Sequence, residues 1–450
     1  MLISFSVENF LSLNKKTTFT MEGGRVTKKP EHLIHDEDGK KELLCFSAIF
    51  GKNGAGKSNL IKAIDSLKKI VTIGGLPSYA VDWWCKSDLK NKDLPGRFEI
   101  TFITEKKIFQ YSIGIVFSTG ILTEEKLVKI VGNRHTTLYS KDDSGQYTFH
   151  HSIKGKKNEL EVLSRAFAMS GNVFLHNINQ NTAGFFEENP QSEVLKKVYL
   201  WFRDSLNVIL PDEPIQTTSF LQFELNKPEL LELLKYFDTG IENIEFIQTS
   251  QQYVFDTFDL ETQQRLLRSM NSVKTSIQSD SAHPDKILST VVRNRNGIFI
   301  IRLENDGSFN FYVLNFIHII NGHKIALSMR NESDGIHRLF QIIEILMDKT
   351  EKVYVMDEIN RSLHPKLTIQ FVKKFLELAP GRRTQLITTT HESRLMSHDL
   401  VRRDEIWLTD TNPDSSTKLF SLEDQQVRID KVLDENYLNN AWGGVPVFDE

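Results

Sequence analysis

The chain has 450 residues, a net charge of −4, 40% hydrophobic residues and 25% charged residues. This composition is typical of a soluble globular protein. It excludes a disordered chain and a strongly polycationic nucleic-acid binder, so any nucleic-acid contact must use a local basic patch. The length allows about three domains. The two cysteines, Cys45 and Cys85, lie apart from other metal-binding residue types, and we expect core thiols.

The N-terminal residues alternate between polar and apolar side chains. Residues 2–7 and 17–21 predict two antiparallel strands, and residues 97–103 and 108–116 predict a hairpin. Glu8 stands where a signal peptide needs an unbroken apolar segment. No later run approaches the roughly 18 apolar residues that a membrane span requires. We therefore expect a cytoplasmic protein.

A short apolar run at residues 45–50 leads into a glycine-rich loop, and a helical pattern follows it. The loop fits G-x-x-x-x-G-K-[ST], the pattern of a phosphate-binding loop, whose glycines allow a tight turn with N–H groups pointing inward. Lys57 would reach the β- and γ-phosphates of ATP, and Ser58 would place its hydroxyl on Mg²⁺. The strand and helix around the loop favour this reading over a simple helix cap. The residues assigned to nucleotide binding are Gly51, Lys52, Asn53, Gly54, Ala55, Gly56, Lys57, Ser58 and Asn59.

The middle of the chain changes from strand patterns to helical periodicity. Helices are expected at residues 158–169, 192–206, 227–237 and 262–279, and strands return at residues 297–303 and 309–320. We predict an N-terminal lobe over residues 1–150, an inserted, mainly helical subdomain over 151–290 and a C-terminal lobe over 291–450.

A β-prone run at residues 352–356 ends in two carboxylates, Asp357 and Glu358. Buried acids need a cation or a reaction to balance their charge. In a phosphate-loop ATPase, Asp357 would bind Mg²⁺ and Glu358 would orient and deprotonate the attacking water. The alternative is that both acids only cap the next loop.

Two further positions could contact phosphate. Ser333 and Gly335 precede an apolar helix, whose N-terminus would favour an anion, although taken alone the pattern favours an ordinary helix cap. His391 ends a strand predicted at residues 385–391, where it is either structural or a contact to the γ-phosphate.

In order, these motifs resemble those of ATP-binding-cassette (ABC) ATPases, in the compact branch that includes chromosome-maintenance and recombination-repair heads. More narrowly, the chain is similar to the AAA15-type ATPases, a bacterial family that includes the RloA and AbiLi ATPases of two-gene phage-defence modules. The matching segments are residues 2–12, 332–339, 357–365 and 437–446. The resemblance implies an α/β fold: an ABC-type P-loop head with a mixed sheet, antiparallel N-terminal strands and an insertion.

The resemblance also implies a mechanism. ATP and Mg²⁺ bound to one protomer would be covered by Ser333 and Gly335 of a second, which gives an ATP-linked homodimer or higher homo-oligomer. The catalytic residues would be Glu358, His391 and Lys57, and the metal ligands would be Ser58 and Asp357. Hydrolysis would release or reshape the dimer.

Three positions depart from the family pattern. Leu11 stands where relatives often carry a basic residue, and His337 replaces a small polar residue in the signature region. The third is the glutamine that usually senses Mg²⁺, which has no assigned position; Gln110 is a weak candidate, and the alternative is that it is an ordinary strand residue.

Two functions remain open at this point. The first is a defence ATPase that senses an invader and controls a separately encoded toxic effector in abortive infection. The second is a repair or recombination ATPase that clamps nucleic acid directly. A basic run supports the second, with Lys126, Lys129, Arg134, Lys141, Lys154, Lys156 and Lys157 against Asp142 and Asp143. A transporter subunit fits poorly, because no coupling segment or membrane partner is indicated.

Overall fold

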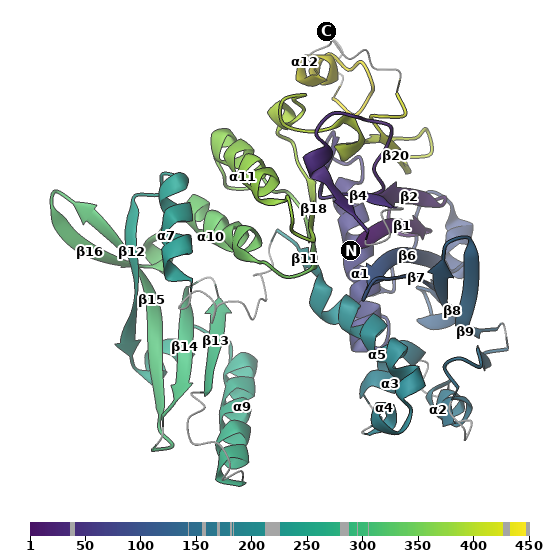
Figure 1. The fold of residues 1–450 in the computed structure, drawn as a ribbon, viewed down its shortest axis with the longest axis horizontal. Coiled ribbons are helices and arrows are strands. Elements are labelled where there is room, and N and C mark those ends of the chain that lie inside the picture. The colour runs from purple at the N-terminus through teal and green to yellow at the C-terminus, as the bar shows by residue number, and fades with distance from the viewer. Residues whose placement is uncertain are drawn as a thin grey trace. The chain divides into compact units, whose positions relative to one another are not determined.

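The computed structural model describes residues 1–36, 41–142, 144–154, 159–168, 172–180, 182, 184–211, 226–279, 288–294, 296–304, 306–425 and 433–446. The chain forms two compact units (Figure 1). The first unit comprises Met1–Pro211, Lys349–Asn360 and Phe371–Glu450, and the second comprises Asp212–Asp348 and Arg361–Gln370. The boundaries expected at residues 150 and 290 are not boundaries of these units. None of the described helices combines the length and the apolarity that crossing a membrane requires.

The first unit contains a seven-stranded antiparallel sheet. Its strand order is β10-β9-β8-β7-β6-β1-β2. The bounds are β1 (Leu2–Glu8), β2 (Thr17–Thr20), β6 (Gly96–Thr104), β7 (Lys107–Val116), β8 (Ile121–Val131), β9 (Arg134–Lys141) and β10 (Tyr147–Phe149). The expected N-terminal strand pair and the hairpin near residue 105 are both confirmed, and Phe5 pairs with Phe19 in the first of them.

A second, mostly parallel sheet lies in the same unit. Its order is β11-β17-β18-β5-β19-β20, with β20 antiparallel to its neighbour. The bounds are β5 (Phe46–Gly51), β11 (Leu206–Ile209), β17 (Lys352–Met356), β18 (Thr384–Thr389), β19 (Ile406–Thr411) and β20 (Thr417–Ser421). Every residue of β5 is buried, as expected for a strand in the middle of a parallel sheet. A short hairpin of β3 (Leu33–His35) and β4 (Glu42–Leu44) completes the strands described in this unit.

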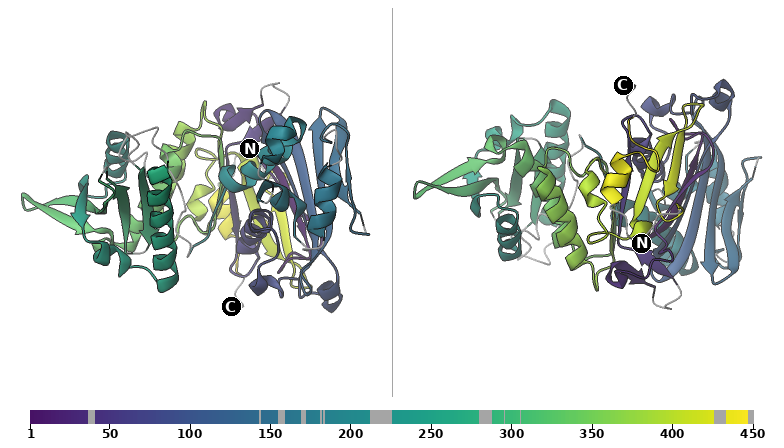
Figure 2. Two further views of the ribbon diagram at one scale, coloured as in Figure 1. Left: turned by 90° about the horizontal axis from the view of Figure 1, so that it is seen from below. Right: turned by 90° about the horizontal axis from the view of Figure 1, so that it is seen from above.

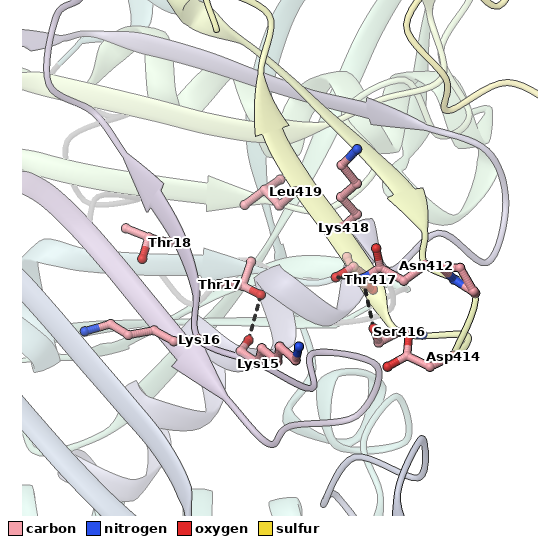
Figure 3. Close-up of a pocket in the computed structure, with 11 residues that line it drawn as sticks. Lys15, Lys16, Thr17, Thr18, Asn412, Asp414, Ser416, Thr417, Lys418 and Leu419 are labelled. Atoms are coloured by element: carbon pink, nitrogen blue, oxygen red, sulfur yellow. Dashed lines mark hydrogen bonds between the residues drawn. The ribbon is translucent and has the colours of Figure 1, made fainter.

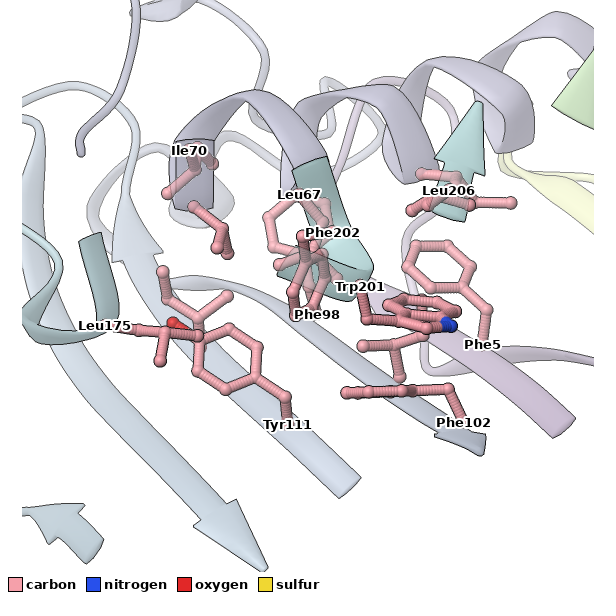
Figure 4. Close-up of a cluster of buried hydrophobic side chains, with 14 of the residues drawn as sticks. Phe5, Leu67, Ile70, Phe98, Phe102, Tyr111, Leu175, Trp201, Phe202 and Leu206 are labelled. Atoms are coloured by element: carbon pink, nitrogen blue, oxygen red, sulfur yellow. The ribbon is translucent and has the colours of Figure 1, made fainter. Parts of the chain in front are cut away.

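Helix α1 (Lys57–Ile73) packs its apolar face into the core of the first unit. Figure 4 shows Leu67 and Ile70 of this helix among aromatic side chains of the antiparallel sheet. Trp201 stacks on Phe102 with ring centroids 4.0 Å apart. Trp201 begins a π-helical turn, Trp201–Ser205, that leads directly into β11.

The helices after residue 150 belong to this same core. They are α2 (Glu159–Ala168), α3 (Phe174–Gln180), α4 (Phe185–Glu188) and α5 (Glu193–Leu200). Phe174 and Val198 are buried in the cluster that contains α1. Glu125 of β8 accepts the N–H groups of Phe174 and Leu175 at the start of α3, which ties this helix to the sheet. The first unit therefore extends to residue 211.

The second unit combines helices with a five-stranded antiparallel sheet. The sheet has the order β12-β15-β14-β13, and β16 pairs with the far end of β15 (Figure 2). The bounds are β12 (Ile241–Thr249), β13 (Leu288–Asn294), β14 (Gly297–Leu303), β15 (Phe309–Ile320) and β16 (His323–Ser328). Its helices are α7 (Lys227–Tyr236), α8 (Gln251–Phe255), α9 (Leu260–Ser279) and α10 (Asp334–Met347), together with the first turns of α11 (Pro365–Leu378). The expected helices near 227 and 262 are confirmed, whereas β12 and β13 were not expected.

Candidate functional site

The phosphate loop lies at the carboxyl edge of the parallel sheet. Strand β5 ends at Gly51, and its neighbour β18 ends at Thr389, just before His391. The next strand, β17, ends at Met356, immediately before Asp357 and Glu358. Because β17, β18 and β5 are adjacent and parallel, their carboxyl ends meet at one edge. The sheet therefore gathers the loop, the acids and the histidine in one place.

The loop passes closely under the β20 strand. Gly56 precedes α1 with a φ of 93°, a left-handed conformation that favours glycine. A Cβ atom at Gly56 would lie 1.9 Å from the Thr417 hydroxyl oxygen. Thr417 in turn hydrogen bonds Ser12 at 2.7 Å, and Asn59 Nδ2 donates to the Ser12 hydroxyl at 2.7 Å. Asn59, assigned to nucleotide binding, thus anchors α1 to the β1–β2 connection.

Lys57 satisfies the carbonyl groups of its own loop. Its Nζ donates to the carbonyls of Gly51 at 2.7 Å and Lys52 at 3.0 Å. Burial lowers the pKa of Lys57 to about 8, although the nearby Asp357 and Glu358 oppose this shift. At neutral pH the amine remains mostly protonated. It is therefore positioned to neutralise a phosphate that enters the loop.

Asp357 is buried and receives two hydroxyl groups. Ser58 Oγ donates to Asp357 Oδ1 at 3.1 Å, and Thr389 Oγ1 donates to the same oxygen at 2.5 Å. A hydroxyl and a carboxylate side by side form the hard oxygen donor set that Mg²⁺ prefers. The described residues contain no cluster of three His, Cys, Asp or Glu side chains that could hold a metal. Ser58 and Asp357 therefore have the donor chemistry to hold a Mg²⁺ ion.

Glu358 has an unusual backbone conformation next to this pair. Its φ of 51° lies in the left-handed region, which is rare for a residue other than glycine. Its N–H donates to Thr389 Oγ1 at 2.8 Å. Thr389 therefore connects to both acids through one hydroxyl group. A strained backbone held by a specific hydrogen bond is typical of a functional position.

His391 lies close enough to Lys57, Asp357 and Glu358 for their charges to shift its pKa. Burial and the charge of Lys57 lower the pKa of His391, while Glu358 and Asp357 oppose the shift. The imidazole is therefore neutral at physiological pH. Its backbone N–H donates to Asn360 Oδ1 at 3.3 Å, and Thr390 Oγ1 donates to the same oxygen at 3.1 Å. Asn360 thus links the end of β18 to the loop that follows the acids.

A contact from the C-terminal segment also supports the phosphate loop. Lys52 pairs with Asp410 of β19 at 3.0 Å. Tyr437 of α12 (Leu433–Leu438) donates its hydroxyl to the Gly444 carbonyl at 3.0 Å, and its ring lies 6.1 Å from that of Phe50. A Cβ atom at Gly444 would lie 3.5 Å from the Gly51 Cα atom. The 437–446 segment quoted for the family resemblance therefore packs against the first turn of the loop.

A polar cavity of about 530 Å³ adjoins Thr417. Figure 3 shows its lining from the start of β2 and the β19–β20 hairpin. Lys15, Lys16 and Lys418 contribute the positive charges, and Asp414 contributes a carboxylate. The hydroxyls and lysines that line this cavity form no motif in the sequence, so the sequence does not predict it.

The remaining predicted residues fall into different settings. Ser333 and Gly335 belong to the second unit, where the Ser333 hydroxyl accepts the N–H of Ile336 at 3.3 Å as a helix cap. Gln110 is an ordinary ladder residue of β7, opposite Thr101 and Val128. The placement of Ser333 and Gly335 on a nucleotide stays a prediction.

Two departures from the family pattern have structural roles. Leu11 adopts a φ of 50° and donates its N–H to the Trp83 carbonyl at 2.7 Å. The His337 ring contacts the Met329 carbonyl. In the basic run, Lys154 pairs with Glu161, and Lys156 and Lys157 lie outside the described residues.

Comparisons with solved structures find heads of SMC proteins. An SmcHead bound to the C-winged helix domain of ScpA shares 15% identity, with 94% of this chain and 99% of that chain covered and a TM-score of 0.41. The SMC head domain from Thermotoga maritima shares 13% identity, with coverage of 93% and 98% and a TM-score of 0.35. An Smc head with an extended coiled coil, bound to the C-terminal domain of ScpA derived from Pyrococcus furiosus, shares 15% identity, with coverage of 94% and 97% and a TM-score of 0.36.

Comparison with curated proteins gave no match. Among protein families, the one described as "AAA domain, putative AbiEii toxin, Type IV TA system" matches residues 46–146 and 167–397. The matched segments contain the phosphate loop, both acids and His391, and they cover most of the chain. This chain therefore belongs to that family of AAA domains.

Proposed function

We propose that this protein binds ATP with Mg²⁺ and hydrolyses the β–γ phosphate bond. The observation that carries the proposal is the single Thr389 hydroxyl, which donates to Asp357 and accepts the Glu358 N–H beside the phosphate loop. This contact fixes a metal-binding acid and a neighbouring acid relative to Ser58, as phosphoryl transfer requires.

Each residue of the site has a proposed role. Loop N–H groups and the Lys57 ammonium hold the phosphates, and Ser58 and Asp357 hold Mg²⁺. A Mg²⁺ ion held by Ser58 and Asp357 would supply positive charge that neutralises the phosphates. Glu358 accepts a proton from the attacking water. The neutral His391 imidazole can orient that water or the γ-phosphate without adding positive charge.

Replacing Glu358 with glutamine tests the proposed general base. The variant keeps the size of the side chain but removes the proton acceptor, so we expect ATP binding near that of the unaltered protein. Turnover should fall by about 100-fold or more. The matched control is Glu377→Gln, which changes an exposed acid on α11. Normal turnover by Glu358→Gln would show that another group acts as the base.

We infer further that ATP links two protomers, with Ser333 and Gly335 of one covering the γ-phosphate held by the other. Ser333 supports this role because it caps α10 with its backbone in the extended region, where helix N–H groups are available to an anion. Glu358→Gln should accumulate dimers in the presence of ATP, and the added change Ser333→Arg should abolish them. Size-exclusion chromatography with light scattering measures both. If both variants stay monomeric while ATP binds, the dimer proposal fails and ATP binding stands.

At the biological level we propose a cytoplasmic defence ATPase whose ATP cycle controls a separately encoded toxic effector. The family description, which names a putative AbiEii toxin and a type IV toxin–antitoxin system, supports this reading. Expression of the intact operon should protect cells from phage, and Glu358→Gln should retain a neighbour-encoded protein during purification. Absence of both effects would contradict the proposal.

The alternative is direct clamping of nucleic acid. Lys126 of β8 and Arg134 of β9 are both exposed, opposite Ser140 and Val131 at the two ends of the β8–β9 ladder, so a nucleic acid that contacts both would run along these strands. Salt-dependent DNA binding that weakens in Lys126→Gln/Arg134→Gln would support this alternative.

A further inference from the structure

A second basic cavity lies in the first unit, away from the phosphate loop. It has a volume of about 170 Å³ and lies between residues 25–29 and residues 398–403. Arg403 comes just before β19, and the far end of β19 pairs Thr409 with Gly51 of the phosphate loop. A strand of this length separates the two sites by roughly 20 Å. The cavity is therefore at the amino edge of the parallel sheet, opposite the nucleotide site.

The lining of this cavity is strongly cationic. Its charged and titratable members are Arg25, Lys28, Lys29, His398, Arg402 and Arg403. The other lining residues are apolar or hydroxylic, and none of the lining residues, all of which the structure describes, carries a carboxylate. In a chain of net charge −4, such a grouping of like charges is unfavourable unless an anion offsets it.

Arg402 forms the rigid base of the cavity. Its side chain is fully buried and makes a bidentate pair with Asp404, with Nε donating to Oδ1 at 2.9 Å and Nη2 to Oδ2 at 2.6 Å. Its Nη1 donates to the Lys28 carbonyl at 2.8 Å and the Lys29 carbonyl at 3.4 Å. Arg402 therefore uses its donors within the protein, and it holds the backbone of the basic segment in place.

The same segment is fixed at three further points. The Gly24 N–H donates to Asp404 at 2.8 Å, and the Arg25 N–H donates to Glu423 at 2.6 Å. Lys29 Nζ donates to the Asp399 carbonyl at 2.6 Å. These bonds use backbone groups and one lysine, so they order the segment without covering the exposed side chains of Arg25 and Lys28. The backbone that carries the cations is therefore ordered before a ligand arrives, which reduces the entropic cost of binding.

The charge balance indicates the kind of ligand. Five Arg and Lys side chains line the cavity. Even if Asp399, Asp404, Glu405 and Glu423 are all counted against them, five positive charges face four negative ones. Arginine forks and lysine ammonium groups together match phosphate oxygens, which carry more than one negative charge and several acceptors.

We propose that this cavity binds a phosphate group, either of a free phosphate ligand or of a nucleic-acid backbone, at a site separate from the ATP site. Lys28 and Arg403 contact the phosphate, Arg25 extends the contact at the rim, and Arg402 positions the segment. The ATP cycle does not require this site, so a protein that fails to hydrolyse ATP would leave the proposal intact.

The test uses the full chain carrying Lys57→Ala, which removes the phosphate-loop ammonium, and compares Lys28→Glu/Arg403→Glu with a matched control. The control is Lys90→Glu/Lys92→Glu, which changes two exposed lysines and shifts the net charge equally. Calorimetry with inorganic pyrophosphate and fluorescence anisotropy with a labelled single-stranded DNA oligonucleotide are the probes. The milder Lys28→Gln/Arg403→Gln variant, checked by circular dichroism, serves if charge reversal disturbs folding.

We expect the cavity variant to lose about tenfold or more in affinity for at least one probe while the control does not. Loss confined to pyrophosphate identifies a free phosphate ligand. Loss of affinity for DNA, together with a shallower dependence of that affinity on salt, identifies a nucleic-acid backbone. Loss of affinity for both probes also supports a phosphate site. If the cavity variants and the control bind both probes equally, the proposal is overturned. In the chain with Lys57 intact, ATP turnover of the cavity variant should equal that of the control.

Discussion

Thr389 offers the sharpest test of how the site is built. Its hydroxyl is fully buried, donates to Asp357 and accepts the N–H of Glu358. Thr389→Val keeps the shape but removes both contacts. An unpaired buried N–H costs about 1–3 kcal/mol, and the loss of a hydrogen bond to a charged group costs about 1.5–3 kcal/mol. The two terms sum to about 2.5–6 kcal/mol, and because the Glu358 N–H is only partly buried, we expect a loss in the lower half of that range.

Turnover should respond as well as stability. Without the hydroxyl, Asp357 and Glu358 are no longer hydrogen bonded to the same side chain, and their relative positions can shift. A displacement of reacting groups by about 1 Å can cost 100-fold in rate. We expect kcat of Thr389→Val to fall by about 10- to 100-fold and the midpoint of thermal unfolding to fall by several degrees. Thr389→Ser keeps the hydroxyl and should recover most of both. Equal turnover by the valine variant and the unaltered protein would refute the reasoning, and so would a serine variant as impaired as valine.

Three further predictions concern the same unit. Because the pKa of Lys57 is about 8 in the free protein, ATP affinity should fall about fivefold between pH 8 and 9 as the ammonium deprotonates, and calorimetry at both pH values measures this. Gly444→Val should raise KM for ATP several-fold with little change in kcat, because φ is +80° and a Cβ would lie only 3.0 Å from the carbonyl oxygen of Thr409, the β19 residue paired with Gly51; a lowered kcat at unchanged KM would contradict it. Trp201→Ala should destabilise the first unit by about 3–5 kcal/mol in urea titrations, whereas Tyr79→Ala, at an exposed ring, should change little.

Local patterns predicted the parts of the site that are continuous in sequence. The phosphate loop, the acids after β17 and His391 each follow a β-prone run, and the parallel sheet brings their ends together. The hydrogen bond between Ser12 and Thr417 joins residues 405 positions apart, and no pattern around either residue indicates it. Contacts of this kind depend on the order of strands in the sheet, which periodicity alone does not determine.

Glu125 shows a second limit of sequence patterns. It lies in β8 between Glu124 and Lys126, and three consecutive charged residues suggest a solvent-facing position. In the structure it is fully buried and accepts hydroxyl hydrogen bonds from Tyr111, Tyr139 and Tyr147. Burial and the charge of Glu125 raise the pKa of Tyr111 and Tyr139 well above their ordinary value. A buried carboxylate with this many donors is recognisable only once the strands are paired, and it explains why α3 belongs to the first unit.

The order of strands also explains how ATP could act on more than its own loop. Strand β5 lies between β18 and β19, so the phosphate loop has a neighbour on each side. On one side, Ser58 contacts Asp357, which Thr389 at the end of β18 also contacts. On the other side, Lys52 pairs with Asp410 of β19, next to the C-terminal segment.

A Mg²⁺ ion between Ser58 and Asp357 would replace their direct hydrogen bond, and phosphate would draw Lys57 from the loop carbonyls. Nucleotide binding would therefore change contacts toward β17 and β18 directly and toward β19 through the loop backbone. Replacing Lys52 with methionine removes the ion pair with Asp410 and should weaken only the effect of ATP on β19 and the C-terminal segment. ATP hydrolysis should persist. Protection of residues 437–446 from hydrogen exchange, however, should no longer increase when ATP is added.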